Sequence, residues 1–275
     1  MIEIPVNPIA FLSIRWYGIM VALAIIVIIL WVMWQVKKGA NLSYETVFTA
    51  AIVGIPSGVV ISRLLHVIDN IVVAKLHPEF VLSGAVIDYT QHPGQIIGGS
   101  GLTIYGAVLG AALGIWIYSK FSRVQFGYLA DLIMPGLILA QVVGRAGCTI
   151  NGCCYGLPTS LPWGVIYTHP DSIAYAASQA LPPGMGLHPT QPYEIIYLLI
   201  IFGVVLMLRR RFKPDGSLFL IYLGLYSVWR IGIDFLREGN PFLFDLHMAQ
   251  VIGIIVLAIA ISLLALRTRW VKAEA

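Results

Sequence analysis

Long apolar runs alternate with short polar segments along almost the whole chain. A helix needs about 20 predominantly apolar residues to cross the hydrocarbon core of a bilayer. The fourth and fifth runs are short, and they reach a full span only if polar residues such as Arg145 or Glu194 enter the membrane. The pattern predicts an all-α integral membrane protein with about seven spans, at Trp16–Gln35, Val47–Ile68, Ile97–Tyr118, Leu129–Val143, Ile195–Leu208, Leu218–Phe235 and Met248–Leu266.

The composition excludes a water-soluble globular protein. Hydrophobic residues make up 59% of the 275-residue chain, charged residues only 11%, and the mean hydropathy is +0.86. A soluble domain needs a more polar surface than this composition provides. No segment is polar enough to form a separate soluble domain, so we expect a single membrane-embedded domain over residues 1–275. The net charge of +4 comes from loop residues, which favours the lipid bilayer as a partner and argues against nucleic acid.

Lysine and arginine residues gather in alternate loops, and short loops rich in these residues stay on the cytoplasmic side of a membrane. They follow the first, third and fifth predicted spans and occupy the tail, at Lys37, Lys38, Lys120, Arg123, Arg209, Arg210, Arg211, Lys213, Arg267, Arg269 and Lys272. Residues 148–194 contain no lysine or arginine. The charges therefore predict an outer N-terminus, a cytoplasmic C-terminus, and Arg145 at the outer end of its span.

Two predicted outer loops are too long to be simple turns. Residues 69–96 and 148–192 are rich in proline, glycine, histidine and tyrosine and carry few charges, a composition suited to the headgroup region. The second loop contains Trp163, Tyr167 and Tyr175. It either caps a cavity from outside or lies at the interface without a functional role.

Glycines cluster in the third predicted span. Gly106, Gly110 and Gly114 have the four-residue spacing that lets two helices approach closely, so they predict helix packing. The group at residues 98–101 lowers helix stability and predicts irregular backbone, which at membrane depth must be buried in protein or line a wet cavity. Tyr105 follows this group, and its phenol either packs with a satisfied hydroxyl or points into that cavity.

Charged residues occur inside otherwise apolar segments near the predicted outer face. An arginine removed from water needs acceptors for its donors, so Arg145 is a candidate functional residue. Arg230 and Asp234 are four residues apart and share a helix face, which predicts an ion pair, and Arg237 lies about one turn further along. These arginines exceed the nearby carboxylates. Because guanidinium groups bind phosphate oxygens bidentately, the pattern indicates a site for an anionic headgroup.

Three cysteines, Cys148, Cys153 and Cys154, follow Arg145 closely. In an oxidising compartment they allow one disulfide with one cysteine left over, and this bridge would involve Cys148 because vicinal cysteines rarely pair. A soft metal is an alternative ligand, but no histidine or second cysteine pair stands at metal-ligand spacing, so we expect no metal. Small buried thiols are the default expectation.

Two other classes of protein fit part of the pattern. A transporter would use Arg145 and Arg230 to bind an anionic solute, but it would be expected to show internal repeats with broken helices, and the sequence has none that we detect. A membrane thiol-redox protein would use Cys148, Cys153 and Cys154, and it would tolerate the loss of Arg230.

Five motifs occur in order along the chain. They are Ile14-Arg15-Trp16-Tyr17-Gly18, the glycine-rich segment from Ile97 to Gly110, Gly144-Arg145-Ala146-Gly147-Cys148-Thr149-Ile150-Asn151-Gly152, His188-Pro189-Thr190-Gln191-Pro192-Tyr193-Glu194, and the segment from Arg230 to Arg237. The third resembles Gly-Arg-x-Gly-Asn-Phe-x-Asn-Gly, the signature of the prolipoprotein diacylglyceryl transferases. Each motif alone is weak, but five in order across the chain make the resemblance specific.

The resemblance implies an enzyme that transfers a diacylglyceryl group from phosphatidylglycerol to the lipobox cysteine thiol of a preprolipoprotein. This first step of lipoprotein maturation forms a thioether and releases glycerol phosphate. It would occur at the outer face of the bacterial cytoplasmic (inner) membrane, without a metal or soluble cofactor. Arg145, Arg230 and Tyr105 are the implied catalytic residues. The implied contacts to phosphatidylglycerol are made by Arg145, Arg230, Tyr17, Asn151, Gly156, Asp234 and Arg237.

The chain departs from the usual family pattern in three places. Tyr105 stands where many members have histidine, and a phenol with a free pKa of about 10 is a poor base at neutral pH, so we expect it to donate a hydrogen bond. Cys148 and Cys153 replace an asparagine and a common glutamate, which removes two polar partners from around Arg145. Asp234 replaces a glutamate and keeps the charge with a shorter reach.

Overall fold

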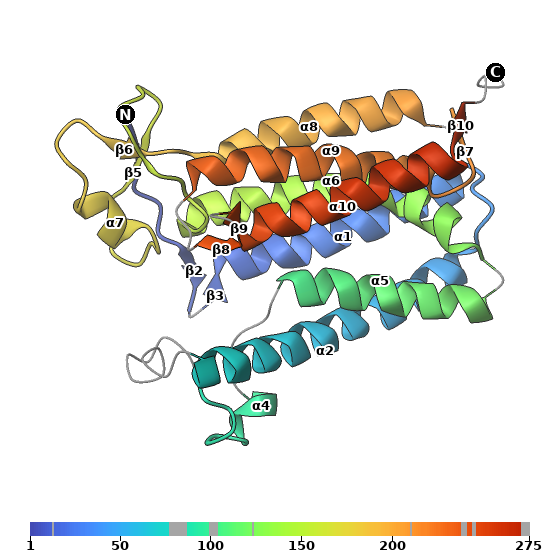
Figure 1. Ribbon diagram of the computed structural model, residues 1–275, viewed down its shortest axis with the longest axis horizontal. Coiled ribbons are helices and arrows are strands. Elements are labelled where there is room, and N and C mark those ends of the chain that lie inside the picture. Colours follow the sequence, from blue (N-terminus) through green and yellow to red (C-terminus); the bar gives the residue numbers. More distant parts are fainter. Residues whose placement is uncertain are drawn as a thin grey trace. The chain divides into compact units, whose positions relative to one another are not determined.

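The computed structural model describes residues 1–12, 14–76, 87–98, 104–122, 124–209, 211–237, 241–243 and 246–270. The chain forms two compact units. Met1–Lys38 and Gly127–Ala275 make up the larger unit, and Gly39–Phe126 make up the smaller one. Both units are mainly helical (Figure 1).

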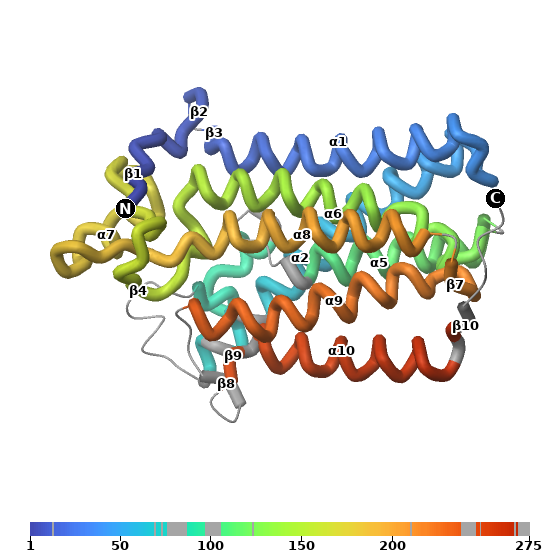
Figure 2. Tube along the Cα trace, turned by 90° about the horizontal axis from the view of Figure 1, so that it is seen from above, coloured from blue at the N-terminus to red at the C-terminus, as the bar shows by residue number. Residues whose placement is uncertain are grey.

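Five long helices form the body of the larger unit. They are α1 (Trp16–Lys37), α6 (Phe126–Asn151), α8 (Thr190–Leu208), α9 (Ser217–Ile233) and α10 (Met248–Arg267). Their axes are roughly aligned in two perpendicular views (Figures 1 and 2). Each helix is long and apolar enough to cross a membrane, which confirms five of the predicted spans.

Polar residues lengthen the two spans that looked short in the sequence. Helix α6 continues past Val143 to Asn151 and so contains Arg145, and α8 begins at Thr190 and so contains Glu194. Every backbone polar group inside a bilayer needs an internal partner, and a continued helix supplies one. Both helices therefore extend beyond the predicted spans, which ended at Val143 and began at Ile195, and they reach full length by including Arg145 and Glu194.

The core of the larger unit lies where α6, α8 and α9 meet. Helices surrounded by lipid associate through close packing and interhelical hydrogen bonds, because lipid tails are as apolar as the side chains themselves. The Tyr222 hydroxyl accordingly donates a hydrogen bond to Gln141 Oε1 at 2.9 Å. The buried core side chains are Met134, Ile138, Leu198, Ile201, Val205, Leu218 and Tyr222.

The start of α9 is held by a carboxylate from α6. Asp131 accepts hydrogen bonds from the backbone amides of Gly216 and Phe219, both at 2.8 Å. The first amides of a helix have no partner within it, so this contact satisfies them. Gly216 has φ +97°, and a Cβ on Gly127 would lie 2.4 Å from the Asp215 carbonyl oxygen. Glycine at these positions lets the connection between α8 and α9 approach α6 closely.

Residues 152–189, between α6 and α8, form a folded cap together with the amino terminus. The short helix α7 (Tyr175–Gln179) and a small core of Val165, Tyr167, Ala174 and Leu187 belong to this cap, which lies at one end of the helices (Figure 1). The sequence predicted only a long loop here, because strands of two or three residues carry no detectable periodicity. The cap contains a four-stranded sheet with the order β1-β5-β6-β4 (Ile2–Ile4, Val165–Tyr167, Gly186–Leu187 and Pro158–Thr159), in which β1 and β5 are parallel.

Short antiparallel pairs and one 3-10 helix complete the described secondary structure of the larger unit. The 3-10 helix η1 (Asp234–Leu236) directly follows α9. The pairs lie next to the ends of the long helices. They are β2 (Ile9–Phe11) with β3 (Ile14–Arg15), β7 (Phe212–Lys213) with β10 (Arg269–Trp270), and β8 (Pro241–Leu243) with β9 (Leu246–His247).

The smaller unit contains α2 (Tyr44–Leu76), α4 (Gln95–Gly98) and α5 (Ile104–Phe121) among the residues described. Helix α2 is long and apolar enough to span a membrane, and α5 is a shorter apolar helix. Ile97 lies in α4, and α5 covers the predicted span from Ile104 onward; residues 99–103, between these two helices, lie outside the described residues. Most of the segment for which irregular backbone is predicted, residues 99–101, lies outside the described residues.

Small residues let α2 and α5 pack closely. A Cβ on Gly110 would lie 2.4 Å from the Ser57 carbonyl oxygen and 2.7 Å from Ile61 Cβ, and one on Gly114 would lie 2.6 Å from Ser57 Oγ. These distances are shorter than ordinary van der Waals contact, so the helices approach this closely only with glycine. The predicted packing role of Gly110 and Gly114 is confirmed.

We predict that Gly110→Ala destabilises the protein by about 1–3 kcal/mol, because the added methyl group overpacks the contact with α2. Gly203→Ala is the matched control, since its Cβ would meet nothing within 4 Å. Thermal unfolding of both variants in the same detergent measures the difference. Equal melting temperatures would show that the two helices separate at little cost.

Candidate functional site

Four helix ends meet beside the cap of the larger unit. The chain passes along the bundle in alternating directions, so the C-terminal ends of α6 and α9 lie at the same end as the N-terminal ends of α8 and α10 (Figure 2). Each of these ends carries polar side chains. Arg145 comes from α6, Glu194 from α8, Arg230 from α9, and His247 directly precedes α10.

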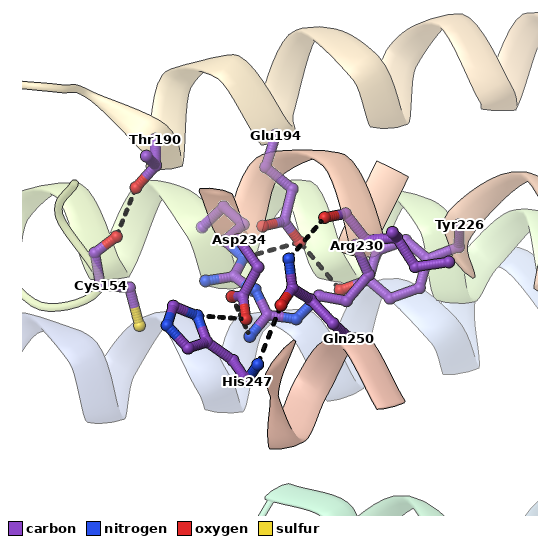
Figure 3. Close-up of polar contacts among 10 residues, drawn as sticks. Cys154, Thr190, Glu194, Tyr226, Arg230, Asp234, His247 and Gln250 are labelled. Atoms are coloured by element: carbon purple, nitrogen blue, oxygen red, sulfur yellow. Dashed lines mark hydrogen bonds and ion pairs between the residues drawn. The ribbon is translucent and has the colours of Figure 1, made fainter. Parts of the chain in front are cut away.

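Arg145 is paired with a buried glutamate across two helices. Its Nε lies 2.9 Å from Glu194 Oε1, and the Glu194 side chain is only 3% exposed. The Tyr226 hydroxyl donates a second hydrogen bond to the same oxygen at 2.9 Å (Figure 3). No described residue accepts a hydrogen bond from the two terminal nitrogens of Arg145. The pair therefore holds the guanidinium in place and leaves its outer edge available.

Arg230 and Asp234 form the ion pair predicted from their spacing. Arg230 Nη2 lies 3.1 Å from Asp234 Oδ1, and His247 Nδ1 lies 3.1 Å from the other carboxylate oxygen (Figure 3). Arg230 Nη1 is buried, and it has no hydrogen-bond partner within the described parts of the chain. A buried donor without an acceptor costs about 1–3 kcal/mol, and more when it is charged. This nitrogen therefore favours an added anion.

Arg237 supplies the excess positive charge that the sequence predicts. It is half-buried after η1, and no ion pair to it occurs among the residues described. Glu194 and Asp234 balance Arg145 and Arg230, which leaves one arginine over. The pairing of Arg145 with Glu194 was missed from the sequence, although Glu194 lies in one of the five motifs.

His247 is the site residue for which the sequence gave no signal. Besides its contact with Asp234, its backbone amide donates to Gln250 Oε1 at 2.9 Å, and Gln250 Nε2 donates to the Ile231 carbonyl at 3.3 Å. These bonds tie the start of α10 to the end of α9. No motif includes this histidine, because its role depends on a carboxylate from another helix.

The three cysteines gather at the end of α6. Their Sγ atoms all lie within 4.8 Å of one another, Cys148 is buried, and Cys153 and Cys154 are half-buried. All three are free thiols. Hydrogen bonds from Cys148 and Cys153 lower the pKa of the Cys154 thiol, and the positive charges of Arg237 and Arg145 act in the same direction.

Two of the other predicted site residues make structural contacts. Asn151 Oδ1 accepts a hydrogen bond from Arg15 Nη1 at 3.1 Å, which ties the end of α6 to the start of α1. A Cβ on Gly156 would lie 2.4 Å from the Leu236 carbonyl oxygen and 2.7 Å from His188 Cβ. Gly156 therefore lets the cap cross the segment after α9 at close range.

Of the two tyrosines predicted to belong to the site, the structure describes the surroundings of Tyr17 but not those of Tyr105. Tyr17 lies in the first turn of α1, close enough to Arg145 and the three cysteines to interact with them electrostatically. Tyr105 is the second residue of α5, in the smaller unit, and its side chain lies outside the described residues. The structure therefore places Tyr17 near Arg145 and leaves the role of Tyr105 as a prediction.

The fold and the site define a multi-pass membrane protein in which two ion-paired arginines present spare donors at one end of a helical bundle. Such an arrangement is suited to binding a phosphate group, because guanidinium donors match phosphate oxygens in geometry and charge.

Comparison with known proteins identifies the family. The family model described as prolipoprotein diacylglyceryl transferase matches residues 6–266. A phosphatidylglycerol–prolipoprotein diacylglyceryl transferase from Dehalococcoides mccartyi is 45% identical over 98% of this chain and 96% of the relative. Proteins of the same name from Clostridium tetani (35% identical, 84% of this chain, 83% of the relative) and Nostoc sp. (32%, 92% and 85%) also match. The chain belongs to the prolipoprotein diacylglyceryl transferase family.

Proposed function

We propose that the chain transfers a diacylglyceryl group from phosphatidylglycerol to a prolipoprotein, the first step of lipoprotein maturation. Membership of the family and the names of its relatives support this activity. The observation within the structure that carries it is the buried Arg230 Nη1, which has no acceptor among the described residues. A guanidinium nitrogen in this state fits an anionic lipid headgroup.

The phosphate of phosphatidylglycerol binds to Arg145 and Arg230 in this proposal. Glu194 engages Nε of Arg145 and Asp234 engages Nη2 of Arg230, which leaves the other guanidinium nitrogens to bind the phosphate. The two arginine side chains are 18% and 19% exposed, so part of each can be reached by a lipid, and Arg230 Nη1 lies just beneath this exposed part. Tyr17 and Arg237 are further proposed contacts.

The reaction requires that the lipid and the thiol be positioned next to each other and that negative charge on the leaving group be stabilised. The thiol of the lipobox cysteine loses its proton, and its sulfur attacks the glycerol carbon that bears the phosphate. The C–S bond forms as the C–O bond to the phosphate breaks, and glycerol phosphate leaves with the bonding electrons. Arg145 and Arg230 stabilise the negative charge that develops on the leaving phosphate.

The remaining predicted contacts have supporting roles in this proposal. Asn151 and Gly156 keep the end of α6, the start of α1 and the cap together, and Asp234 orients Arg230. We propose that both compact units act as one catalytic domain, since the family model covers them without interruption.

We place the enzyme in the bacterial cytoplasmic (inner) membrane, with the site toward the outer face. The charge distribution supports this orientation, because the segment that forms the cap carries no lysine or arginine while alternate loops carry several. The alternatives of an anion transporter and a thiol-redox protein are not favoured, since the family is a transferase family.

The test of the function is direct transfer by the purified protein. It is incubated with phosphatidylglycerol and a lipobox peptide, and mass spectrometry is used to detect a diacylglycerol attached to the cysteine through a thioether. A relative of established activity is the positive control. An unmodified peptide, with the control active, would contradict the function.

We predict that Arg145→Ala and Arg230→Ala each slow transfer by about 100- to 1,000-fold or more, because each removes a group that stabilises the leaving phosphate. Lysine at either position should rescue poorly, since a point charge cannot reproduce the bidentate fork. Initial transfer rates measure the effect, and Arg211→Ala, at an exposed position outside the site, is the control. Normal turnover in either alanine variant would make that arginine structural.

Tyr105→Phe is predicted to slow transfer by about 10- to 100-fold, the effect of one lost hydrogen bond to the headgroup. Tyr105→His should retain activity, because histidine occupies this place in many family members. Transfer rates are measured together with lipid binding. A complete loss of transfer in Tyr105→Phe with lipid binding intact would instead make Tyr105 the obligatory base.

The orientation predicts which added cysteines a membrane-impermeant thiol reagent labels in intact cells. Ile173→Cys in the cap, at a position 54% exposed, should be labelled, whereas Phe121→Cys, at a position 83% exposed, should not be. The unmodified chain controls for native thiols, and lysed cells should label at both positions. The reverse pattern would place the site on the cytoplasmic face.

A further inference from the structure

The cysteine cluster is the feature of the site that the transfer chemistry leaves unexplained. The three Sγ atoms of Cys148, Cys153 and Cys154 lie within 4.8 Å of one another. Sulfurs bound at about 2.3 Å to one tetrahedral zinc ion are about 3.8 Å apart, so small rotations of these side chains would bring them to that separation. A disulfide would use two of the thiols and leave the third without a role.

The turn that carries two of these thiols is held rigidly. Cys154 has φ +64°, a left-handed conformation that is uncommon for a residue other than glycine, and it follows Gly152 at φ +74°. Gln191 Nε2 donates to the Cys153 carbonyl at 2.7 Å, and Thr190 Oγ1 donates to the Cys154 carbonyl. Both donors belong to the first turn of α8. Backbone strain of this kind persists where the surroundings enforce it, and it is concentrated at functional sites.

The same contacts decide where the thiols point. With its carbonyl directed toward Thr190, Cys154 has its sulfur on the opposite side of the residue (Figure 3). The Cys153 amide donates to the Cys148 carbonyl at 3.2 Å, which folds the turn back on the end of α6. The chain thus brings Cys153 and Cys154 back to Cys148.

The charges around the cluster complement an anionic metal site. Three thiolates and one divalent cation carry a net charge of −1. Arg145 and Arg237 both lie close enough to Cys154 to interact with it electrostatically, and Arg237 has no carboxylate partner among the residues described. The positive charges of these two arginines are opposite in sign to the net charge of such a site.

We propose that Cys148, Cys153 and Cys154 bind one thiophilic divalent cation, Zn²⁺, and that its fourth coordination position accepts the substrate thiol. Three protein ligands with one open position are the arrangement of catalytic zinc sites. This assignment replaces the expectation from the sequence that no metal is bound. It depends on residues in which this chain differs from the usual motif, since Cys148 and Cys153 stand where that motif has asparagine and glutamate.

This assignment rests on the proposed function, and it supplies the thiol activation that Tyr105 is poorly suited to provide. A thiol that coordinates the cation releases its proton to solvent and becomes a bound thiolate. The thiolate sulfur then attacks the glycerol carbon, the C–O bond to phosphate breaks, and the thioether product leaves the cation. The ion undergoes no redox change, and its coordination returns to three protein thiolates.

The first arm of the test measures metal binding without activity. The full-length reduced protein in detergent is stripped with a chelator and titrated with Zn²⁺, and native mass spectrometry gives the stoichiometry. We expect one ion per chain, at least tenfold weaker affinity in Cys148→Ser, Cys153→Ser and Cys154→Ser, and unchanged melting temperatures of the metal-free variants. The control is the triple serine variant carrying Ile173→Cys, whose single exposed thiol should bind no ion.

The second arm uses Co²⁺ in place of Zn²⁺, because its visible absorption reports its ligands. Addition of a lipobox peptide should change this spectrum, and the peptide with serine in place of the cysteine should not. In the transfer assay, stripping the metal should lower the rate at least tenfold and Zn²⁺ should restore it.

Several results would overturn the assignment. They are the absence of a bound ion, a disulfide among the three cysteines in the active protein, a Co²⁺ spectrum unaffected by the peptide, and full transfer by stripped protein. The last result would leave the proposed function intact. If neither the stripped nor the metal-loaded protein transfers the diacylglyceryl group, the proposed function is contradicted. The metal stoichiometry and the Co²⁺ spectrum would still show whether the three cysteines bind a metal.

Discussion

The structure depends on compensating charge inside helices that are otherwise apolar. Arg145 lies within α6, and its pairing with Glu194 joins α6 to α8. Arg230 and Asp234 neutralise each other at the end of α9, and His247 extends this contact to the start of α10. Breaking a buried ion pair by removing one partner typically costs about 3–5 kcal/mol, because the remaining charge is left uncompensated. These ion pairs allow charged residues to lie within membrane-spanning helices, and they also fix the geometry of the site.

Each ion pair occupies only some of the hydrogen-bond donors of its arginine. The remaining donors can bind a ligand, so a contact that stabilises the fold also forms part of a binding site. Glu194 takes only Nε of Arg145, and Asp234 takes only Nη2 of Arg230. The remaining donors are held in place by contacts that a ligand does not need to replace. A preorganised set of donors of this kind loses little energy to reorganisation when charge develops on a phosphate.

The cap connects this chemistry to the rest of the chain. Its first turn is held to α8 by hydrogen bonds from Gln191 and Thr190. The cap also passes close to the segment after α9, which is possible because Gly156 has no side chain. The cysteines, the arginines and the cap are thus positioned by the same few helix ends. A change in one of these ends would alter the anion site and the thiol cluster together.

The sequence by itself determined the features that depend on local spacing. A spanning helix satisfies its backbone internally, so apolar runs alone located the five long helices of the larger unit, and the four-residue spacing of Arg230 and Asp234 was enough to predict their ion pair. Only the tertiary structure decided which distant residues meet. The pairing of Arg145 with Glu194, the contact of His247 with Asp234 and the parallel pairing of β1 with β5 join segments whose separation carries no periodic signal, because each contact is set by how helix ends pack.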